Sequence, residues 1–251
     1  MTAKVLKLNG AQPGATIAPL ANVSRCTEAL ERAMSRPPHL PGMVAFYGPS
    51  GWGKTIAATY TANKHRAYYV EAKSSWTRKA LLAAILTEMG IDAGKTLYDM
   101  TDQVSEQLVR SNRPLIVDEF DHLVQAGTVE IVRDIHEGSG AAILILGEEQ
   151  LAAKLKAWER FHNRMLAWVP AQPAALDDAR HLRKLYAAEI EIRDDLLRRI
   201  TDVARGAARR ICVNLDLVQQ EASKERWKSV GLKEWASREL YTGEAPARRL
   251  G

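Results

Sequence analysis

Between residues 20 and 170, short apolar runs alternate with longer stretches in which apolar residues recur at helical spacing. The apolar runs show little polar alternation, which is typical of strands buried on both faces of a parallel sheet. The pattern therefore predicts an α/β fold with a five-stranded parallel sheet flanked by helices. Strands are expected over residues 43–47, 67–71, 114–119, 141–146 and 166–169, and helices over residues 22–35, 55–63, 77–89, 101–110, 128–137 (closed by Gly138) and 151–158.

The pattern changes after Pro170 and Pro173, beyond which only helical spacing is found. This change predicts a small helical bundle and a last helix anchored by Trp235 and Leu240. The bundle helices are expected over residues 176–190, 194–205 and 208–223, and the last helix over residues 232–241. The domain organisation predicted is an arm (1–20), an α/β domain (21–171), a helical lid (172–225) and a C-terminal helix and tail (226–251), disordered from 242.

Composition narrows the class of protein. With 251 residues, 46% of them hydrophobic and 26% charged, the chain can form a sizeable core. The net charge of +5 is compatible with a polyanionic partner without requiring one. Cys26 and Cys212 lack metal-ligand spacing and are expected to be buried or inert thiols. No signal peptide is evident and the longest apolar run, 141–146, is too short to span a bilayer, so a cytoplasmic protein without a membrane partner is expected.

Residues 48–55 match the phosphate-loop pattern G-x-x-x-x-G-K-[ST] at every fixed position. The loop follows a predicted strand and precedes a predicted helix, so its backbone N–H groups and the helix N-terminus would point at a polyphosphate. ATP and Mg²⁺ are the cofactors expected, with Lys54 reaching the β- and γ-phosphates and Thr55 holding the metal. The predicted nucleotide contacts are Gly48, Pro49, Ser50, Gly51, Trp52, Gly53, Lys54 and Thr55.

Two carboxylates, Asp118 and Glu119, end the apolar strand of residues 114–119. An acid at the carboxyl end of a parallel strand lies beside the phosphate loop. Asp118 is therefore expected to hold hydrated Mg²⁺, and Glu119 to polarise the water that attacks the γ-phosphate. This pair favours a nucleotide hydrolase over a small-molecule kinase.

An α/β nucleotide domain followed by a helical lid resembles the AAA+ ATPase plan over about residues 20–225. The run Val-Asp-Glu-Phe-Asp-His-Leu at 117–123 resembles the acidic motif of the AAA+ group that serves transposition and secretion. That group includes the phage Mu B-like target activators, the transposon target-selector ATPases and the ExeA-like ATPases. The resemblance implies a P-loop AAA+ sheet, a C-terminal all-helical lid and ATP hydrolysis.

Further site residues are implied by this resemblance. Arg164, just before the fifth strand, matches an arginine finger that acts in trans on a neighbouring subunit, and Arg160 is the alternative. Arg209 matches the lid arginine that contacts the γ-phosphate in cis. At the end of the fourth strand, Gly147 and Glu148 replace the usual Asn or Thr sensor, which leaves that role unassigned. A homo-oligomer, either ring or helical filament, is implied.

No autonomous DNA-reading module is evident, so the ATPase core itself would have to bind DNA. The turn after the second strand faces the central channel in the oligomers that the chain resembles, where Lys and Arg would neutralise phosphates. Alternatively, this turn is a solvated helix start with Trp76 packed on the domain. The predicted contacts to double-stranded DNA, largely without sequence preference, are Lys73, Ser74, Thr77, Arg78 and Lys79. A second, weaker basic candidate surrounds Trp227.

The function predicted is an ATP-dependent DNA-binding AAA+ ATPase that oligomerises on double-stranded DNA and delivers it to a transposase. If the chain is phage-encoded, it would work in the cytoplasm of the bacterial host. Two alternatives remain open: a helicase-loader type of ATPase, and an ExeA-like protein-assembly ATPase that does not bind DNA.

Overall fold

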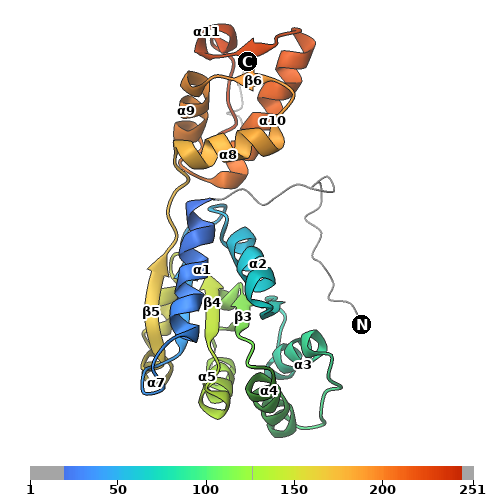
Figure 1. Ribbon diagram of the computed structural model, residues 1–251, viewed down its shortest axis with the longest axis vertical. Helices are drawn as coiled ribbons and strands as arrows, with labels where there is room; N and C mark the ends of the chain where they lie inside the picture. Colours follow the sequence, from blue (N-terminus) through green and yellow to red (C-terminus); the bar gives the residue numbers. More distant parts are fainter. Residues whose placement is uncertain (1–19, 126, 245–251) are drawn as a thin grey trace, which may run out of the picture. The chain divides into compact units, whose positions relative to one another are not determined.

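The computed structural model describes residues 20–125 and 127–244 (Figure 1). The predicted N-terminal arm, except for its last residue, and most of the predicted tail lie outside the described residues. The chain forms two compact units. One consists mainly of residues 22–171 and the other mainly of residues from 172 onward, and each is described by itself.

The first unit is built on a five-stranded sheet with the order β2-β3-β4-β1-β5, in which all the strands run parallel. The predicted α/β fold is thus confirmed. The interior strand β3, which lies between β2 and β4, is buried at all of its positions, which explains why its sequence is apolar without alternation. The strands are β1 (Met43–Tyr47), β2 (Tyr68–Glu71), β3 (Leu115–Asp118), β4 (Ile143–Gly147) and β5 (Met165–Pro170).

Helices cover both faces of this sheet. Met43 and Ala45 share one hydrophobic core with residues of α3, α4, α5, α6 and α7. Val44, between them, is equally buried but faces the other side of the sheet, which α1 and α2 cover (Figure 1). The hydroxyls of Thr27 and Thr61, 2.9 Å apart, join these two helices. The helices are α1 (Ala21–Met34), α2 (Lys54–His65), α3 (Arg78–Met89), α4 (Leu97–Ser111), the 3-10 turn η1 (Phe120–Leu123), α5 (Thr128–Ser139), α6 (Leu151–Leu155) and α7 (Glu159–His162).

Two helix ends differ from the prediction for reasons of capping. Helix α4 begins four residues earlier than the predicted 101, because Thr96 and Asp99 form a reciprocal capping box. Helix α5 runs through Gly138, which was predicted to close it. Gly140 ends the helix instead, with φ +63° and its N–H donating to the carbonyl of His136.

The single helix predicted over residues 151–158 is wrong. The chain forms α6 and α7 with a turn between them, and Trp158 has a non-helical backbone (φ −106°, ψ 73°). Leu155 and Phe161, on the two sides of this turn, are both fully buried, so the turn lets both reach the core.

The second unit consists of α8 (Leu176–Tyr186), α9 (Asp194–Val203), α10 (Ala208–Lys224), α11 (Leu232–Trp235) and two short strands. These strands, β6 (Glu191–Ile192) and β7 (Ser229–Val230), pair in parallel, so the purely helical prediction for this region is wrong. Helix α11 ends at Trp235 rather than at 241. Ala236, the next residue, has φ +52° and ψ −125° and does not continue the helix. Further along, the buried Asn214 holds Tyr241: its Oδ1 accepts from the N–H of Tyr241 (2.7 Å) and its Nδ2 donates to the carbonyl of Tyr241 (2.9 Å).

Both thiols are free in this structure. Burial raises the pKa of the Cys26 thiol to about 12 and that of Cys212 to about 11, in agreement with inert thiols. Among the described helices, none has the length and hydropathy needed to cross a bilayer.

Candidate active site

The phosphate-loop residues connect β1 to α2, as the sequence predicted. Gly51 and Gly53 both have φ +83°, a left-handed conformation that side chains with a Cβ rarely adopt. Gly48 is buried, and a Cβ there would lie 3.0 Å from the Cβ of Ala171. Its N–H donates to the carbonyl of Gly147, which ties the start of the loop to the end of β4. The glycines are thus required by backbone angle at two positions and by space at the third.

Lys54 opens α2 and turns its ammonium back onto the loop. Its Nζ donates to the carbonyls of Gly48 (2.8 Å) and Pro49 (3.0 Å). Burial lowers the pKa of Lys54, and the charges of Glu119 and Asp118 partly oppose that shift. A half-buried ammonium is suited to binding a polyanion. The oxygens of the polyanion would replace the loop carbonyls as hydrogen-bond acceptors.

Asp118 ends β3, and each oxygen of its carboxylate accepts one hydrogen bond. It is 1% exposed; its Oδ2 accepts from the hydroxyl of Tyr69 (2.9 Å) and its Oδ1 from the N–H of Glu119 (2.8 Å). Burial and the charge of Asp118 raise the pKa of Tyr69 far above its usual range, so the phenol stays a donor. Tyr69 orients Asp118 but was not singled out from the sequence. It belongs to β2, which pairs with β3, and no local motif marks that neighbour.

Glu119 has φ +54°, a left-handed conformation that is uncommon for a residue with a side chain. Burial, then the neighbouring Asp118, raises the pKa of the Glu119 carboxyl, and Lys54 and His122 oppose the shift. Its carboxylate makes no hydrogen bond within the described part of the chain. A raised pKa and unused acceptor oxygens fit a group that must bind and polarise a water molecule.

A third carboxylate, Asp121, lies at the end of β4. Its Oδ2 accepts from the N–H of Glu148 at 2.5 Å, and its Oδ1 from the ammonium of Lys154 at 2.8 Å. At the unassigned sensor position, Gly147 has no side chain to offer, and Glu148 is exposed. The sequence placed Asp121 within the acidic run at 117–123 but gave it no role, because its partners come from another strand and helix.

The residues present fit ATP with Mg²⁺. The loop has the glycine conformations and the lysine that a triphosphate requires. The side chain of Thr55, in the first turn of α2, is exposed and makes no hydrogen bond to other described residues. Hydroxyl and carboxylate oxygens are ligands that Mg²⁺ accepts, and it often keeps waters between itself and the protein. Thr55 and Asp118 would hold the ion.

The two candidate finger arginines differ in their partners. Arg164 is held by Glu137 of α5, whose Oε1 accepts from its Nε (2.8 Å) and pairs with its Nη2 (2.7 Å). Arg160, in α7, is exposed and has no ion-pair partner among the residues that the structure describes. Both line a surface hollow of about 340 Å³ together with Arg133. Of the two arginines, Arg160 could therefore reach a neighbouring subunit without first breaking an ion pair.

The predicted DNA-contacting residues do not form one uniform surface. Lys73 and Ser74 are exposed in the turn after β2, whereas Thr77 caps α3 by accepting from the N–H of Ala80. Lys79 donates to the carbonyl of Lys95. Trp76 is half-buried and packs on the core, as the alternative interpretation of this turn expected.

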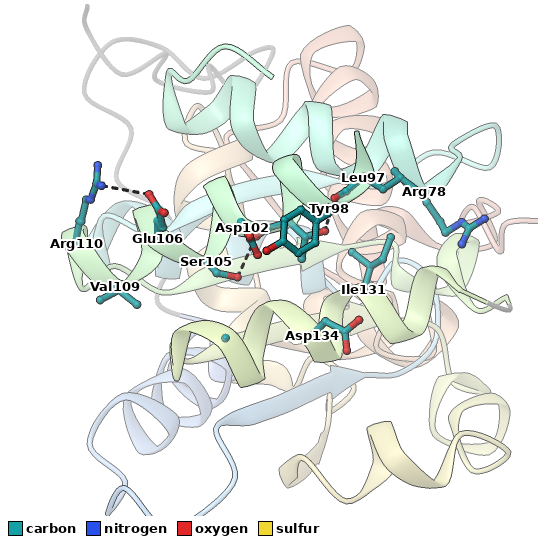
Figure 2. A pocket seen from close by; sticks show the side chains of 12 residues that line it. Arg78, Leu97, Tyr98, Asp102, Ser105, Glu106, Val109, Arg110, Ile131 and Asp134 are labelled. Atoms are coloured by element: carbon teal, nitrogen blue, oxygen red, sulfur yellow. Dashed lines mark hydrogen bonds and ion pairs between the residues drawn. The ribbon is translucent and has the colours of Figure 1, made fainter. Parts of the chain in front are cut away.

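Arg78 lines a groove of about 680 Å³ between α4 and α5 (Figure 2). A Cβ on Gly127 would lie 3.0 Å from its Nη1, so the guanidinium lies beside the start of α5. Asp102, Glu106 and Asp134 also line this groove. Carboxylates would repel a phosphate backbone, which argues against Arg78 as a DNA contact. Lys73 does not line this groove and remains a predicted contact.

Arg209 belongs to the second unit, where it is exposed in the first turn of α10. It follows Gly206, whose φ of +69° ends the preceding turn. Its role as a γ-phosphate sensor remains a prediction.

The sheet order, the phosphate loop between β1 and α2, and the acidic pair at the end of β3 are typical of the AAA+ core fold. Residues 39–155 match a sequence family described as an AAA domain. This segment contains the phosphate loop, Asp118, Glu119 and Asp121. No curated protein matches the chain by sequence.

Solved structures share the fold at low identity. The ORC2 protein of Aeropyrum pernix in ADPNP-ADP complexes has a TM-score of 0.65 and 18% identity over 92% of this chain and 69% of its own. The Cdc6p of Pyrobaculum aerophilum has a TM-score of 0.65 and 17% identity over 87% and 66%. The RuvB Holliday junction branch migration motor of Thermotoga maritima has a TM-score of 0.59 and 19% identity over 85% and 67%.

Proposed function

We propose that the protein is a Mg²⁺-dependent ATPase that binds double-stranded DNA in its ATP-bound state. The observation that carries the ATPase part is geometric. Lys54 turns its ammonium onto the carbonyls of Gly48 and Pro49 in a loop whose Gly51 and Gly53 have left-handed backbones. The acids at the end of β3 lie close enough for their charges to raise the pKa of Lys54 against the effect of burial.

Each residue of the site has a separate role in the proposed ATP hydrolysis. Lys54 and the loop N–H groups bind and orient the polyphosphate. Asp118, oriented by Tyr69, and Thr55 would hold Mg²⁺, which would supply neutralisation of phosphate charge. Glu119 accepts a hydrogen bond from a water molecule and aligns it for in-line attack on the γ-phosphate.

Two substitutions separate binding from hydrolysis. Lys54→Ala removes the cation that compensates the phosphates and should abolish ATP binding. Glu119→Gln keeps the size of the side chain but removes the base, so it should keep binding and slow turnover by about 100-fold or more. Nucleotide affinity and phosphate release would be measured for both, with Lys64→Ala as the control because Lys64 lies exposed on the same helix. Parent-like turnover by Glu119→Gln would rule out the role of that carboxylate.

Three observations support the DNA part of the proposal. The chain is basic, and Lys73 and Ser74 are exposed in one turn. A structure of the Aeropyrum pernix ORC1 protein in complex with DNA has a TM-score of 0.59 and 18% identity over 85% of this chain and 62% of its own. Contacts to phosphates rather than to base edges would give binding that depends little on sequence.

Assembly is the third part of the proposal. An arginine from the segment between α6 and β5 would complete the site of a neighbouring subunit, in a ring or a helical filament, and Arg209 would contact the γ-phosphate in cis. The acidic run at 117–123, which resembles that of the transposition group, supports delivery of the bound DNA to a transposase.

A further inference from the structure

Three residues attach the turn that carries Glu119 to the rest of the first unit. Asp118 precedes it in β3, and Phe120, which follows, is fully buried and stacks on Phe161 at 5.7 Å between ring centroids. The third attachment is Asp121, which reaches across to the end of β4 and to α6. A residue with a side chain held at φ +54° needs such surrounding contacts to stay there.

The carboxylate of Asp121 is enclosed by neighbouring residues. It is only 7% exposed, although its partner Lys154 is 45% exposed. A Cβ on Gly147 would lie 2.3 Å from the Oδ2 of Asp121 and 2.7 Å from Leu151. Gly147 does not have a left-handed backbone, so the glycine makes room for the carboxylate rather than permitting an unusual turn.

This attachment connects the turn to the phosphate loop. The carbonyl of Gly147 accepts a hydrogen bond from the N–H of Gly48, the first residue of the phosphate loop. The next N–H along the chain, that of Glu148, donates to Asp121. The end of β4 therefore bonds to the start of the phosphate loop through the carbonyl of Gly147 and to the Glu119 turn through the N–H of Glu148.

We propose that Asp121 is a positioning residue for ATP hydrolysis, because its carboxylate fixes the turn that carries Glu119 against the end of β4. Lys154 is its partner and keeps the carboxylate in one orientation. This inference rests on the proposed ATPase function. It assigns Asp121 no contact with nucleotide, metal or water.

The test compares Lys154→Met, Lys154→Arg and Asp121→Ala with the parent. Lys154 is largely exposed, so its replacement by Met removes the ion pair without endangering the fold. Misplacing a catalytic group by a fraction of an ångström is costly, so kcat should fall about 10-fold or more in Asp121→Ala and less in Lys154→Met. Lys154→Arg keeps the charge and should restore most of the turnover. Lys156→Met, an exposed lysine just beyond the same helix, is the control.

Two readouts separate positioning from a general loss of structure. The affinity for a non-hydrolysable ATP analogue should stay within about twofold of the parent, because the loop and Lys54 are untouched. Hydrogen exchange of the nucleotide-free protein should quicken at the amides of His122 and Val124, which bond within the turn. An equal loss of nucleotide affinity and kcat would overturn the inference.

The parent is measured first. If the parent does not hydrolyse ATP, the proposed function fails and the inference fails with it. If the parent hydrolyses ATP while both Asp121→Ala and Lys154→Met keep parental kcat, only the inference is overturned.

Discussion

Single residues in this protein owe their properties to partners that are distant in sequence. Lys54, Asp118 and Glu119 were predicted from local motifs, since a phosphate loop and an acidic strand end are recognisable within a few residues. Tyr69 and Asp121 were not assigned a role, because their contacts cross from one strand to the next. Sequence reasoning thus identified the groups that are proposed to contact the nucleotide better than the groups that orient them.

His136 gives a residue-scale prediction about pH. It is buried; its Nε2 accepts from the N–H of Gly42 (3.3 Å), so its protonated Nδ1 donates to the carbonyl of Ala141 (2.9 Å). Burial, first of all, lowers the pKa of His136 below its usual 6.5. Between the two pKa values the unfolded chain binds the proton and the folded protein does not. Stability should therefore fall as the pH drops below about 6.5 and level off below the folded pKa.

Chemical denaturation between pH 8 and pH 5 measures this effect for the parent, His136→Asn and, as control, His39→Asn, which alters an exposed histidine. The loss of stability with falling pH should be smaller in His136→Asn and unchanged in His39→Asn. Equal pH slopes in the parent and His136→Asn would contradict the assignment of a neutral buried imidazole.

At the scale of elements, the five strands and most helices of the first unit followed from the hydrophobic pattern, whereas several boundaries and the break between α6 and α7 did not. The ends of α4 and α5 depend on a capping box and on which of two glycines takes the left-handed conformation. In the second unit, the β6–β7 pair and the hydrogen bonds between Asn214 and Tyr241 depend on contacts between distant residues. Periodicity alone cannot indicate either.

Gly140 provides the element-scale prediction. It has φ +63° at the end of α5, and a Cβ there would meet nothing within 4 Å, so only backbone strain opposes a side chain. Gly140→Ala should destabilise the protein by about 1–2 kcal/mol, and Gly140→Asn by less, because Asn tolerates this conformation better. Denaturant midpoints would be compared with that of the parent. A neutral or stabilising Gly140→Ala would contradict Gly140 as the helix end.

At the scale of the whole molecule, the proposed assembly would complete the site with an arginine from a neighbouring subunit. Arg160 is free of partners among the described residues, whereas Arg164 would have to leave Glu137 to reach a neighbour. Arg160→Ala alone should therefore lose most ATP turnover, and more of it than Arg164→Ala. Mixing Arg160→Ala with Lys54→Ala should restore part of it, since one subunit brings an intact loop and the other an intact finger.

Steady-state turnover of each variant and of mixtures at several ratios measures this effect, with Arg164→Ala mixed in the same way for comparison. Full turnover by Arg160→Ala alone would remove Arg160 from the finger role and return it to Arg164.

The central claim is that the ATP-bound state, and not the ADP-bound state, binds duplex DNA. The most direct measurement is a salt titration of binding to a labelled duplex in the presence of a non-hydrolysable ATP analogue or of ADP. We predict binding with the analogue alone, similar affinity for unrelated sequences, and a linear fall of the logarithm of the binding constant with the logarithm of salt concentration. Lys73→Ala should lower the magnitude of that slope by about one for each phosphate that the lysine no longer neutralises. Equal binding with the analogue and ADP, or no duplex binding with the analogue at low salt, would contradict the account.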